Sequence, residues 1–345
     1  MDIPVEERTS LGRRGRDGHG DTRGHPRVAV GVDGSPGSRA ALAHALTMAA
    51  RRGAELEVVS AYPVPLSWAG EYPVDVPAPE VLRADTEAHL RDVLAEVRRD
   101  PAVTTVAGTD DIAVAFFVAA GPAAPTLLDR AEHADVLVVG NRGRGAVRSV
   151  LLGSVALHCV AQGRGPVVVV HERLRQPAGP PTVVVGVDGS PHSRLALTTA
   201  IHEAGRLAAD VEVVAVHEVT NYWLDAYPLA TPSLDDIRTA TRRHVDALVS
   251  GVQAALAMNS VTPMPTIRTV ITEGSPAEIL VERSQSADLL VVGGTKRSAL
   301  RGLLVGSVAL SAALHAACPV MIARGMARER STTSARPGEA ATARG

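Results

Sequence analysis

The chain contains the same arrangement of segments twice. Residues 28–36 read Val-Ala-Val-Gly-Val-Asp-Gly-Ser-Pro, and residues 183–191 read Val-Val-Val-Gly-Val-Asp-Gly-Ser-Pro after a shift of 155 residues. A second stretch, rich in glycine, begins at Val136 and returns at Leu289 after a shift of 153 residues. Because the spacing changes by only two residues between the two matches, the sequence predicts a duplicated domain rather than a short recurring motif.

The length of 345 residues favours two domains, and composition places the boundaries. Residues 173–181 hold three prolines and a glycine, as expected of a linker. We therefore predict one domain at 27–172 and a second at 182–324. The polar segments 1–26 and 325–345 show no hydrophobic periodicity, and we expect both to be disordered tails.

Each half alternates apolar strand patterns with helical patterns. In the first half the expected strands are 27–33, 55–61, 111–120, 136–139 and 166–170. The expected helices are 39–52, 80–99, one after a turn within 121–134, and 155–162, with Ser38 as the cap of the first. Apolar residues make up 46% of the chain but aromatic residues only 2%, so the cores must consist of Val, Ala and Leu. This order of elements predicts a doubly wound parallel sheet in each half.

One edge of such a sheet collects the candidate binding residues. Asp33 ends the first strand and Gly140 ends the fourth, and ligands of these sheets bind at the carboxyl ends of strands where the strand order reverses. Gly140 and Gly143 are expected to leave room for phosphate oxygens, and Gly153 and Ser154 begin a helix whose free N–H groups face the same anion. The sequence therefore predicts a nucleotide phosphate site.

Several side chains near this site have two interpretations. Arg142, Arg144 and Arg148 either contact phosphate or form a solvated basic surface, and Ser154 either binds phosphate or caps its helix. Asp33, like its equivalent Asp188, fits an acceptor of a ribose hydroxyl or a cap of the following turn.

The second copy of the glycine-rich stretch differs from the first. Lys296 occupies the position of Gly143, and Gly294 is expected to shift the turn by one residue. We therefore expect a weaker or altered second site. Each copy also has a Trp-x-x-x-Tyr-Pro segment, at Trp68 and Trp223, for which loop packing and a lid over the base are the two hypotheses.

Composition excludes several other classes of function. A formal net charge of −2 gives no electrostatic reason to expect nucleic acid or an anionic membrane as a partner, and no apolar run reaches the ~20 residues of a membrane span. Cys159 and Cys318 are expected to be reduced core residues, since no set of metal ligands with suitable spacing is evident. The first residues form no secretory hydrophobic segment, so the expected location is cytoplasmic.

The residues described above resemble the universal stress protein family in its tandem two-domain form. That family's nucleotide signature is Gly, two residues, Gly, nine residues, Gly, then Ser or Thr, and Gly140, Gly143, Gly153 and Ser154 match it. The Gly-Val-Asp-Gly-Ser-Pro segments and the run 166–170 are also similar to the family. In the second copy Gly293, Gly306 and Ser307 match, whereas Lys296 departs from the pattern.

The resemblance implies two Rossmann-like α/β domains of the adenine nucleotide alpha hydrolase type, each with five parallel strands flanked by helices. It implies ATP as ligand, with Mg²⁺ on the phosphates, and pairing of the two last strands as a pseudo-dimer, with further homodimerisation expected. The implied first site is Gly31, Val32, Asp33, Ala61, Gly140, Asn141, Arg142, Gly143, Arg144, Gly145, Gly153, Ser154 and Val155. The implied second site is Gly186, Val187, Asp188, Val216, Gly293, Gly294, Lys296, Gly306, Ser307 and Val308.

The family's role implies a nucleotide-dependent regulator in a stress or dormancy response. Two alternatives stay open: a slow ATPase or nucleotide transferase on the same fold, and an interaction scaffold without nucleotide. The sequence has no Walker-type loop and no evident base for an attacking water, which argues against the enzyme.

Overall fold

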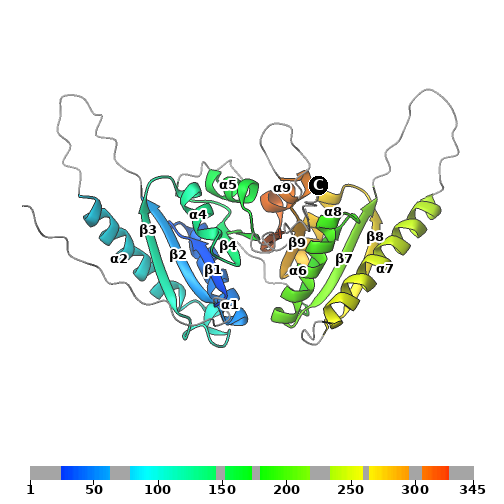
Figure 1. Ribbon diagram of the computed structural model, residues 1–345, viewed down its shortest axis with the longest axis horizontal. Coiled ribbons are helices and arrows are strands. Elements are labelled where there is room, and N and C mark those ends of the chain that lie inside the picture. Colours follow the sequence, from blue (N-terminus) through cyan, green and yellow to red (C-terminus); the bar gives the residue numbers. More distant parts are fainter. Residues whose placement is uncertain are drawn as a thin grey trace, which may run out of the picture.

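The computed structural model describes residues 25–62, 78–144, 152–172, 179–217, 234–258, 264–294 and 305–325. Within these ranges the two repeats form two α/β halves that lie side by side (Figure 1). The tails, the two tryptophan segments, most of the linker and the middle of each glycine-rich loop lie outside the described residues.

The first repeat alternates strands and helices as the sequence predicts. Its strands are β1 (Arg27–Gly31), β2 (Glu55–Tyr62), β3 (Val114–Ala120), β4 (Val136–Gly140) and β5 (Val167–Val170). Its helices are α1 (Pro36–Arg52), α2 (Pro79–Val97), α3 (Pro101–Thr104), α4 (Ala123–Ala131) and α5 (Ser154–Gln162).

The second repeat follows the same order. Its strands are β6 (Thr182–Val187), β7 (Asp210–His217), β8 (Ile267–Glu273), β9 (Leu289–Gly293) and β10 (Val320–Ala323). Its helices are α6 (Pro191–Leu207), α7 (Leu234–Met258), α8 (Pro276–Arg283) and α9 (Ser307–His315), with a short 3-10 turn at Ser284–Ser286.

All ten of these strands form one continuous sheet in the order β3-β2-β1-β4-β5-β10-β9-β6-β7-β8. Neighbouring strands are parallel within each repeat, and β5 pairs with β10 in antiparallel register, Val168 opposite Met321. The predicted pseudo-dimer through the two last strands is therefore confirmed. Strand order reverses between β1 and β4 and between β6 and β9, which fixes the two edges where ligands are expected.

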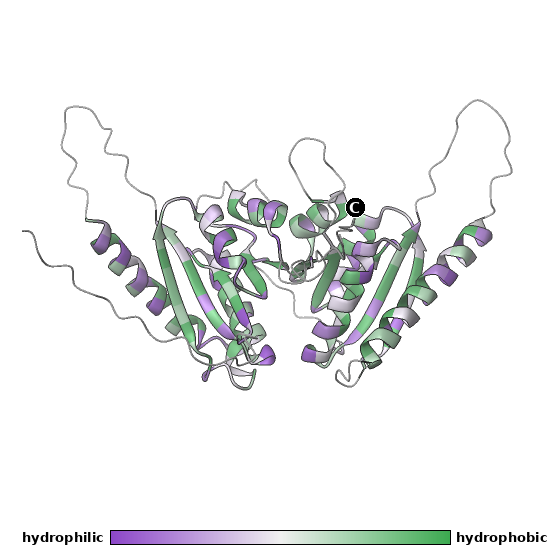
Figure 2. Ribbon diagram, in the orientation of Figure 1, coloured by the Kyte–Doolittle hydropathy of each residue, from purple (hydrophilic) through white to green (hydrophobic). Residues whose placement is uncertain are grey.

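Helices cover both faces of the sheet. On one face α1, α2, α6 and α7 pack over one set of strand side chains, such as Val28 and Val30, and on the other α4, α5, α8 and α9 pack over the alternate set, such as Ala29. Figure 2 shows the strands as largely hydrophobic and the helices as mixed. The largest fully buried side chains are Leu, Met, Ile and Val, as the low aromatic content requires.

Local chemistry moves several boundaries from their predicted positions. Helix α1 begins at Pro36, not residue 39, because Ser35 is the N-cap and its side chain accepts from the N–H of Ser38. The prediction that Ser38 caps this helix is wrong. The predicted strand 111–120 begins only at Val114, and the predicted helix 80–99 ends at Val97, after which Asp100 caps the unpredicted helix α3.

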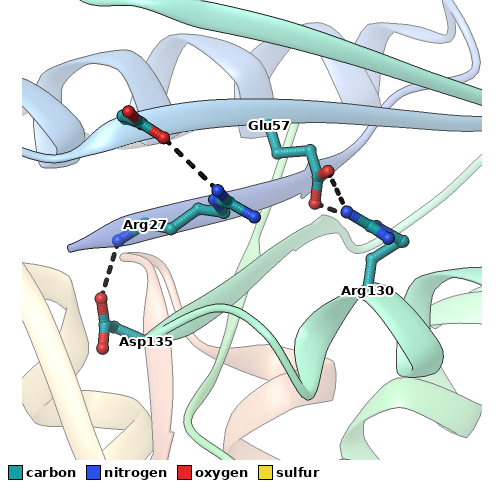
Figure 3. A network of polar contacts seen from close by, with 5 residues as sticks. Arg27, Glu57, Arg130 and Asp135 are labelled. Atoms are coloured by element: carbon teal, nitrogen blue, oxygen red, sulfur yellow. Dashed lines mark hydrogen bonds and ion pairs between the residues drawn. The ribbon is translucent and has the colours of Figure 1, made fainter. Parts of the chain in front are cut away.

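In both repeats an ion pair between a buried glutamate of the second strand and an arginine of a helix holds helix to sheet. In the first, Glu57 in the middle of β2 accepts hydrogen bonds from Arg130 of α4, as Figure 3 shows, while the N–H of Arg27 donates to Asp135 at 2.7 Å. In the second, Glu212 pairs with Arg283 at 2.9 Å, and the N–H of Thr182 donates to Asp288. These contacts recur at the repeat spacings, so the duplication preserved them as part of the fold.

The junction between the repeats has a related symmetry with different side chains. His171 follows β5, and its Nε2 lies 3.1 Å from the main-chain oxygen of Ala313 in α9. Arg324 follows β10, 153 residues later, and donates to the main-chain oxygen of Val160 in α5. Each repeat thus contacts a carbonyl near the end of a helix in the other.

Both cysteines lie in the core. Cys159 and Cys318 are both free and buried, as predicted, and burial raises the pKa of each thiol to about 12. No helix in the described ranges is long and apolar enough to cross a membrane.

Candidate functional site

A cavity of about 420 Å³ lies at the edge of the first half-sheet where the strand order reverses. It is bordered by the carboxyl ends of β1, β2 and β4, the start of α4 and the start of α5. Eleven of the thirteen predicted first-site residues line it, namely Gly31, Val32, Asp33, Ala61, Gly140, Arg142, Gly143, Arg144, Gly153, Ser154 and Val155. Asn141 is buried beside the cavity, where its N–H donates to the main-chain oxygen of Val170 at 2.7 Å. Gly145 lies outside the described residues.

Asp33 connects the first turn to the glycine-rich loop. Its Oδ1 accepts from the N–H and the hydroxyl of Ser35, at 3.0 and 2.6 Å, and its Oδ2 accepts from the N–H of Arg144 at 3.0 Å. Burial raises the pKa of this carboxyl, but the hydrogen bonds from Ser35, Arg144 and Ser38 outweigh it, and the net pKa is lowered. Asp33 is therefore an ionised cap of the turn, one of the two roles that the sequence left open.

Gly140 and Gly143 border the cavity and also permit close contacts within the protein. A Cβ at Gly140 would lie 2.5 Å from the carbonyl carbon and oxygen of Gly37 at the start of α1. A Cβ at Gly143 would lie 2.7 Å from Asp33 Oδ2. Glycine at these two positions therefore has a structural reason that the sequence did not show.

Helix α5 begins with an uncapped turn that borders the cavity. Gly153 is the N-cap, its N–H donates to the main-chain oxygen of Asn141 at 2.7 Å, and Ser154 is already the first helical residue. The alternative that Ser154 caps this helix is therefore wrong. With glycine as the cap, the first amides of α5 have no side-chain acceptor at that position, which leaves the helix end suited to an anion.

Arg142 and Arg144 bring positive charge to the same end of the cavity. Both border it, and Arg144 Nη2 also lies 3.2 Å from His89 Nε2 of α2. The main-chain oxygen of Arg142 faces the Ser35 hydroxyl at 3.3 Å, so the loop is held against the first turn at two successive points.

The opposite end of the cavity is mainly apolar, and sequence reasoning missed much of it. The residues that it did not identify around the cavity are Ser38, Val59, Ser60, Ala123, Thr126, Leu127, Val139 and Ala156. Leu127 packs so closely that a Cβ at Gly31 would lie 2.9 Å from it. The available signal was topological: α4 connects β3 to β4, so its first turn must cross the ends of β2 and β1.

The second repeat places its equivalent residues at the matching edge. Gly186 and Val187 end β6, Val216 lies near the end of β7, Gly293 ends β9, and Gly306 caps α9 ahead of Ser307 and Val308. Asp188 Oδ1 accepts from the N–H of Ser190 at 2.9 Å, as Asp33 does from Ser35.

Gly294 keeps the register of the first repeat. Its N–H donates to Ala323 at 3.0 Å, the equivalent of the bond from Asn141 to Val170, and the rest of the turn lies outside the described residues. Lys296, Arg148 and the segments of Trp68 and Trp223 lie outside the described residues.

Larger side chains occupy the positions equivalent to the apolar end of the first cavity. Val216, Ile279 and Pro276 stand where the first repeat has Ala61, Thr126 and Ala123. Val216 and Ile279 pack against the hydrophobic core on that face of the sheet. Among the described residues, no cluster of three or more His, Cys, Asp or Glu side chains could hold a metal ion.

Several known proteins are similar to this chain in sequence or in fold. The chain is 35% identical over 301 residues to a universal stress protein of Mycobacterium tuberculosis, covering 86% of this chain and 96% of that one. It is 33% identical over 312 residues to another from the same species, covering 86% and 94%. The crystal structure of a universal stress protein from Archaeoglobus fulgidus has a similar fold, with a TM-score of 0.57 at 17% identity, covering 86% of this chain and 98% of that one.

The family model described as "Universal stress protein family" matches residues 25–171 and again residues 181–324. The two matches cover both structural repeats and both copies of the glycine-rich stretch. The chain belongs to the universal stress protein family, in its tandem two-domain form.

Proposed function

We propose that the first repeat binds ATP in the 420 Å³ cavity and that the chain acts as a nucleotide-dependent regulator in a stress or dormancy response. The observation that carries this proposal is the division of the cavity into two chemically distinct ends. Val59, Ala61 and Leu127 of β2 and α4 line one end, and Arg142 and Arg144 lie with the start of α5 at the other.

The apolar end suits a purine base. Val59, Ala61 and Leu127 offer small or flexible apolar surfaces around a slot, and Ser60 and Thr126 add hydroxyl groups that can hydrogen-bond the polar edge of a base. Asp33 lies between the two ends of the cavity. Its Oδ1 already accepts twice from Ser35, but its Oδ2 accepts only the N–H of Arg144, so the second lone pair of Oδ2 can accept a ribose hydroxyl while these contacts are kept.

The other end suits a phosphate chain. The first amides of α5 and the helix dipole favour an anion, typically by ~0.3–1 kcal/mol for the dipole term alone. Arg142 and Arg144 add charge-assisted hydrogen bonds from the loop. Mg²⁺ in such sites is commonly held by the phosphates and water, so a cluster of protein carboxylates is not required.

We do not propose a second ATP site of comparable affinity in the second repeat. Val216 and Ile279 enlarge the side chains at the base end, and Lys296 changes the loop. We expect about one nucleotide per chain under conditions that saturate the first repeat.

The test is the nucleotide content of the full chain. Freshly purified protein is denatured and its soluble fraction is separated by ion-exchange chromatography, and titration calorimetry with Mg·ATP then gives the stoichiometry. ATP at about one per chain supports the proposal. Release of ADP over many turnovers would replace the regulator with a slow ATPase, and absence of any nucleotide binding would leave an interaction scaffold.

A further inference from the structure

His89 of α2 contacts Arg144, which lines the cavity, although His89 is not part of the predicted site. Its Nε2 is 3.2 Å from Arg144 Nη2, and a Cβ added at Gly34 would lie 2.5 Å from His89 Nε2. Three segments distant in sequence therefore meet here: the turn after β1, the glycine-rich loop and α2.

The chemistry of this contact gives it a direction. A guanidinium group has only donors, so His89 Nε2 must be the acceptor and the neutral ring carries its proton on Nδ1. Arg144 is thus held twice, through its main-chain N–H by Asp33 at 3.0 Å and through its side chain by His89. The result is a cation held in place at the phosphate end of the cavity, where Arg144 already forms part of the wall.

The second repeat places a histidine in the same position. His244 of α7 stands 155 residues after His89, and a Cβ added at Gly189 would lie 2.2 Å from its Nε2. Neighbouring exposed positions on these helices have diverged, Ala88 to Arg243 and Arg91 to Asp246. The position equivalent to Arg144 is again an arginine, Arg297, outside the described residues. Both repeats therefore have a histidine and an arginine at these two sequence positions, while neighbouring positions on the helix differ.

We propose that His89 is a positioning residue that holds Arg144 for contact with the phosphate chain, so that the site distinguishes nucleotides by their phosphates. This inference rests on the proposed binding of ATP. Through His89, it gives α2 a role in recognising the phosphate chain.

The contact is exposed, which separates this role from a structural one. An exposed hydrogen bond of this kind contributes little to folding, so removing His89 should leave the protein folded. A freed Arg144 side chain would instead have to be ordered when phosphate binds, and that cost would appear only with phosphorylated ligands.

The experiment compares ATP with adenosine by titration calorimetry on the full-length chain. For His89→Ala we expect about a three- to tenfold loss of ATP affinity and an adenosine affinity unchanged within twofold. His89→Gln, whose amide oxygen can accept from Arg144, should recover most of the loss. Asp92→Ala, an exposed change three residues further along α2, is the matched control and should leave both affinities as they are.

A double variant makes the test specific for Arg144. Arg144→Ala should reduce ATP affinity more than His89→Ala does, and adding His89→Ala to it should cause no further loss. Equal losses for ATP and adenosine, or additive losses in the double variant, would overturn the positioning role while leaving ATP binding intact. If the unmodified chain bound neither ligand, both the proposed function and this inference would fail.

Discussion

The two repeats agree in the contacts that hold the fold and differ in the residues that border the cavity. Glu57 with Arg130 corresponds to Glu212 with Arg283, and Gly31 against Leu127 corresponds to Gly186 against Leu280. The slot residues did not follow this pattern, since Ala61 and Thr126 correspond to Val216 and Ile279. The comparison separates requirements of folding, which both copies share, from requirements of a ligand, which we assign to the first copy.

The largest expected effect comes from replacing the small residues at the apolar end of the first cavity by the larger residues of the second repeat. In the double variant Ala61→Val, Thr126→Ile we expect ATP affinity to fall about a hundredfold or more, because each added branch in a fitted pocket typically costs a factor of ten or more. Titration calorimetry measures this. The fold should survive, because the second repeat already accommodates the same side chains on the same elements.

The matched control is the reverse change, Val216→Ala with Ile279→Thr, which should leave binding at the first repeat unaltered. Full ATP affinity in the forward variant would show that the base does not occupy the apolar end of the cavity.

A smaller effect, on stability, should separate two glycines that occupy equivalent positions. Gly140→Ala places a Cβ 2.5 Å from the backbone of Gly37, whereas Gly293→Ala places one 3.1 Å from the main-chain oxygen of His192. We expect the first to lower the free energy of unfolding by about 3 kcal/mol and the second by about 1 kcal/mol, since a Cβ 2.5 Å from backbone forces the two segments apart, whereas at 3.1 Å a small adjustment relieves the contact. Urea denaturation followed by circular dichroism provides both values, and equal losses would contradict the difference in packing.

The smallest effect concerns acid stability at the contact between α1 and α6. Burial, with Arg51 and Arg52 nearby, lowers the pKa of His44 from its ordinary value to about 4, and its Nε2 has no hydrogen-bond partner among the described residues. Between about pH 6.5 and pH 4, His44 is therefore protonated in the unfolded chain but neutral in the folded chain. Stability should fall as the pH is lowered through this window.

The second repeat provides the variant, because Thr199 occupies the equivalent position. His44→Thr should remove about 1–2 kcal/mol of the acid-induced loss, measured as the free energy of unfolding in urea at pH 7 and pH 4.5. His171 and His202, whose pKa values burial also lowers, should maintain the rest of the slope. An unchanged slope would mean that His44 takes up its proton over the same pH range in the folded and the unfolded chain.

The sequence predicted the fold well because periodicity and repetition report directly on burial. A short apolar run rich in β-branched residues, such as residues 136–139, indicates a strand covered on both faces, and the two shifts match each element of the first half to one in the second. The pairing of β5 with β10 followed from the family resemblance rather than from the residues, since four consecutive valines do not specify a partner.

The site was predicted in part, and the missing part has a physical reason. Asp33 and Gly153 were found because polar and glycine residues interrupt apolar patterns. Leu127 was missed because an apolar side chain on a helix looks the same whether it faces a core or a cavity. The structural reason for Gly140 was also missed, because a sequence cannot show that another backbone passes 2.5 Å from the position of its missing Cβ.

The junction between β5 and β10 has a consequence for how such a protein can evolve. Two separate copies of one repeat, joined by the same strands, would carry every substitution twice, once on each side of the axis. Fusion into a single chain removes that constraint, and the junction itself records it: His171 makes on one side the contact that Arg324 makes on the other. One half of the molecule was therefore free to lose a small-residue slot while its partner kept one, which identical subunits cannot do.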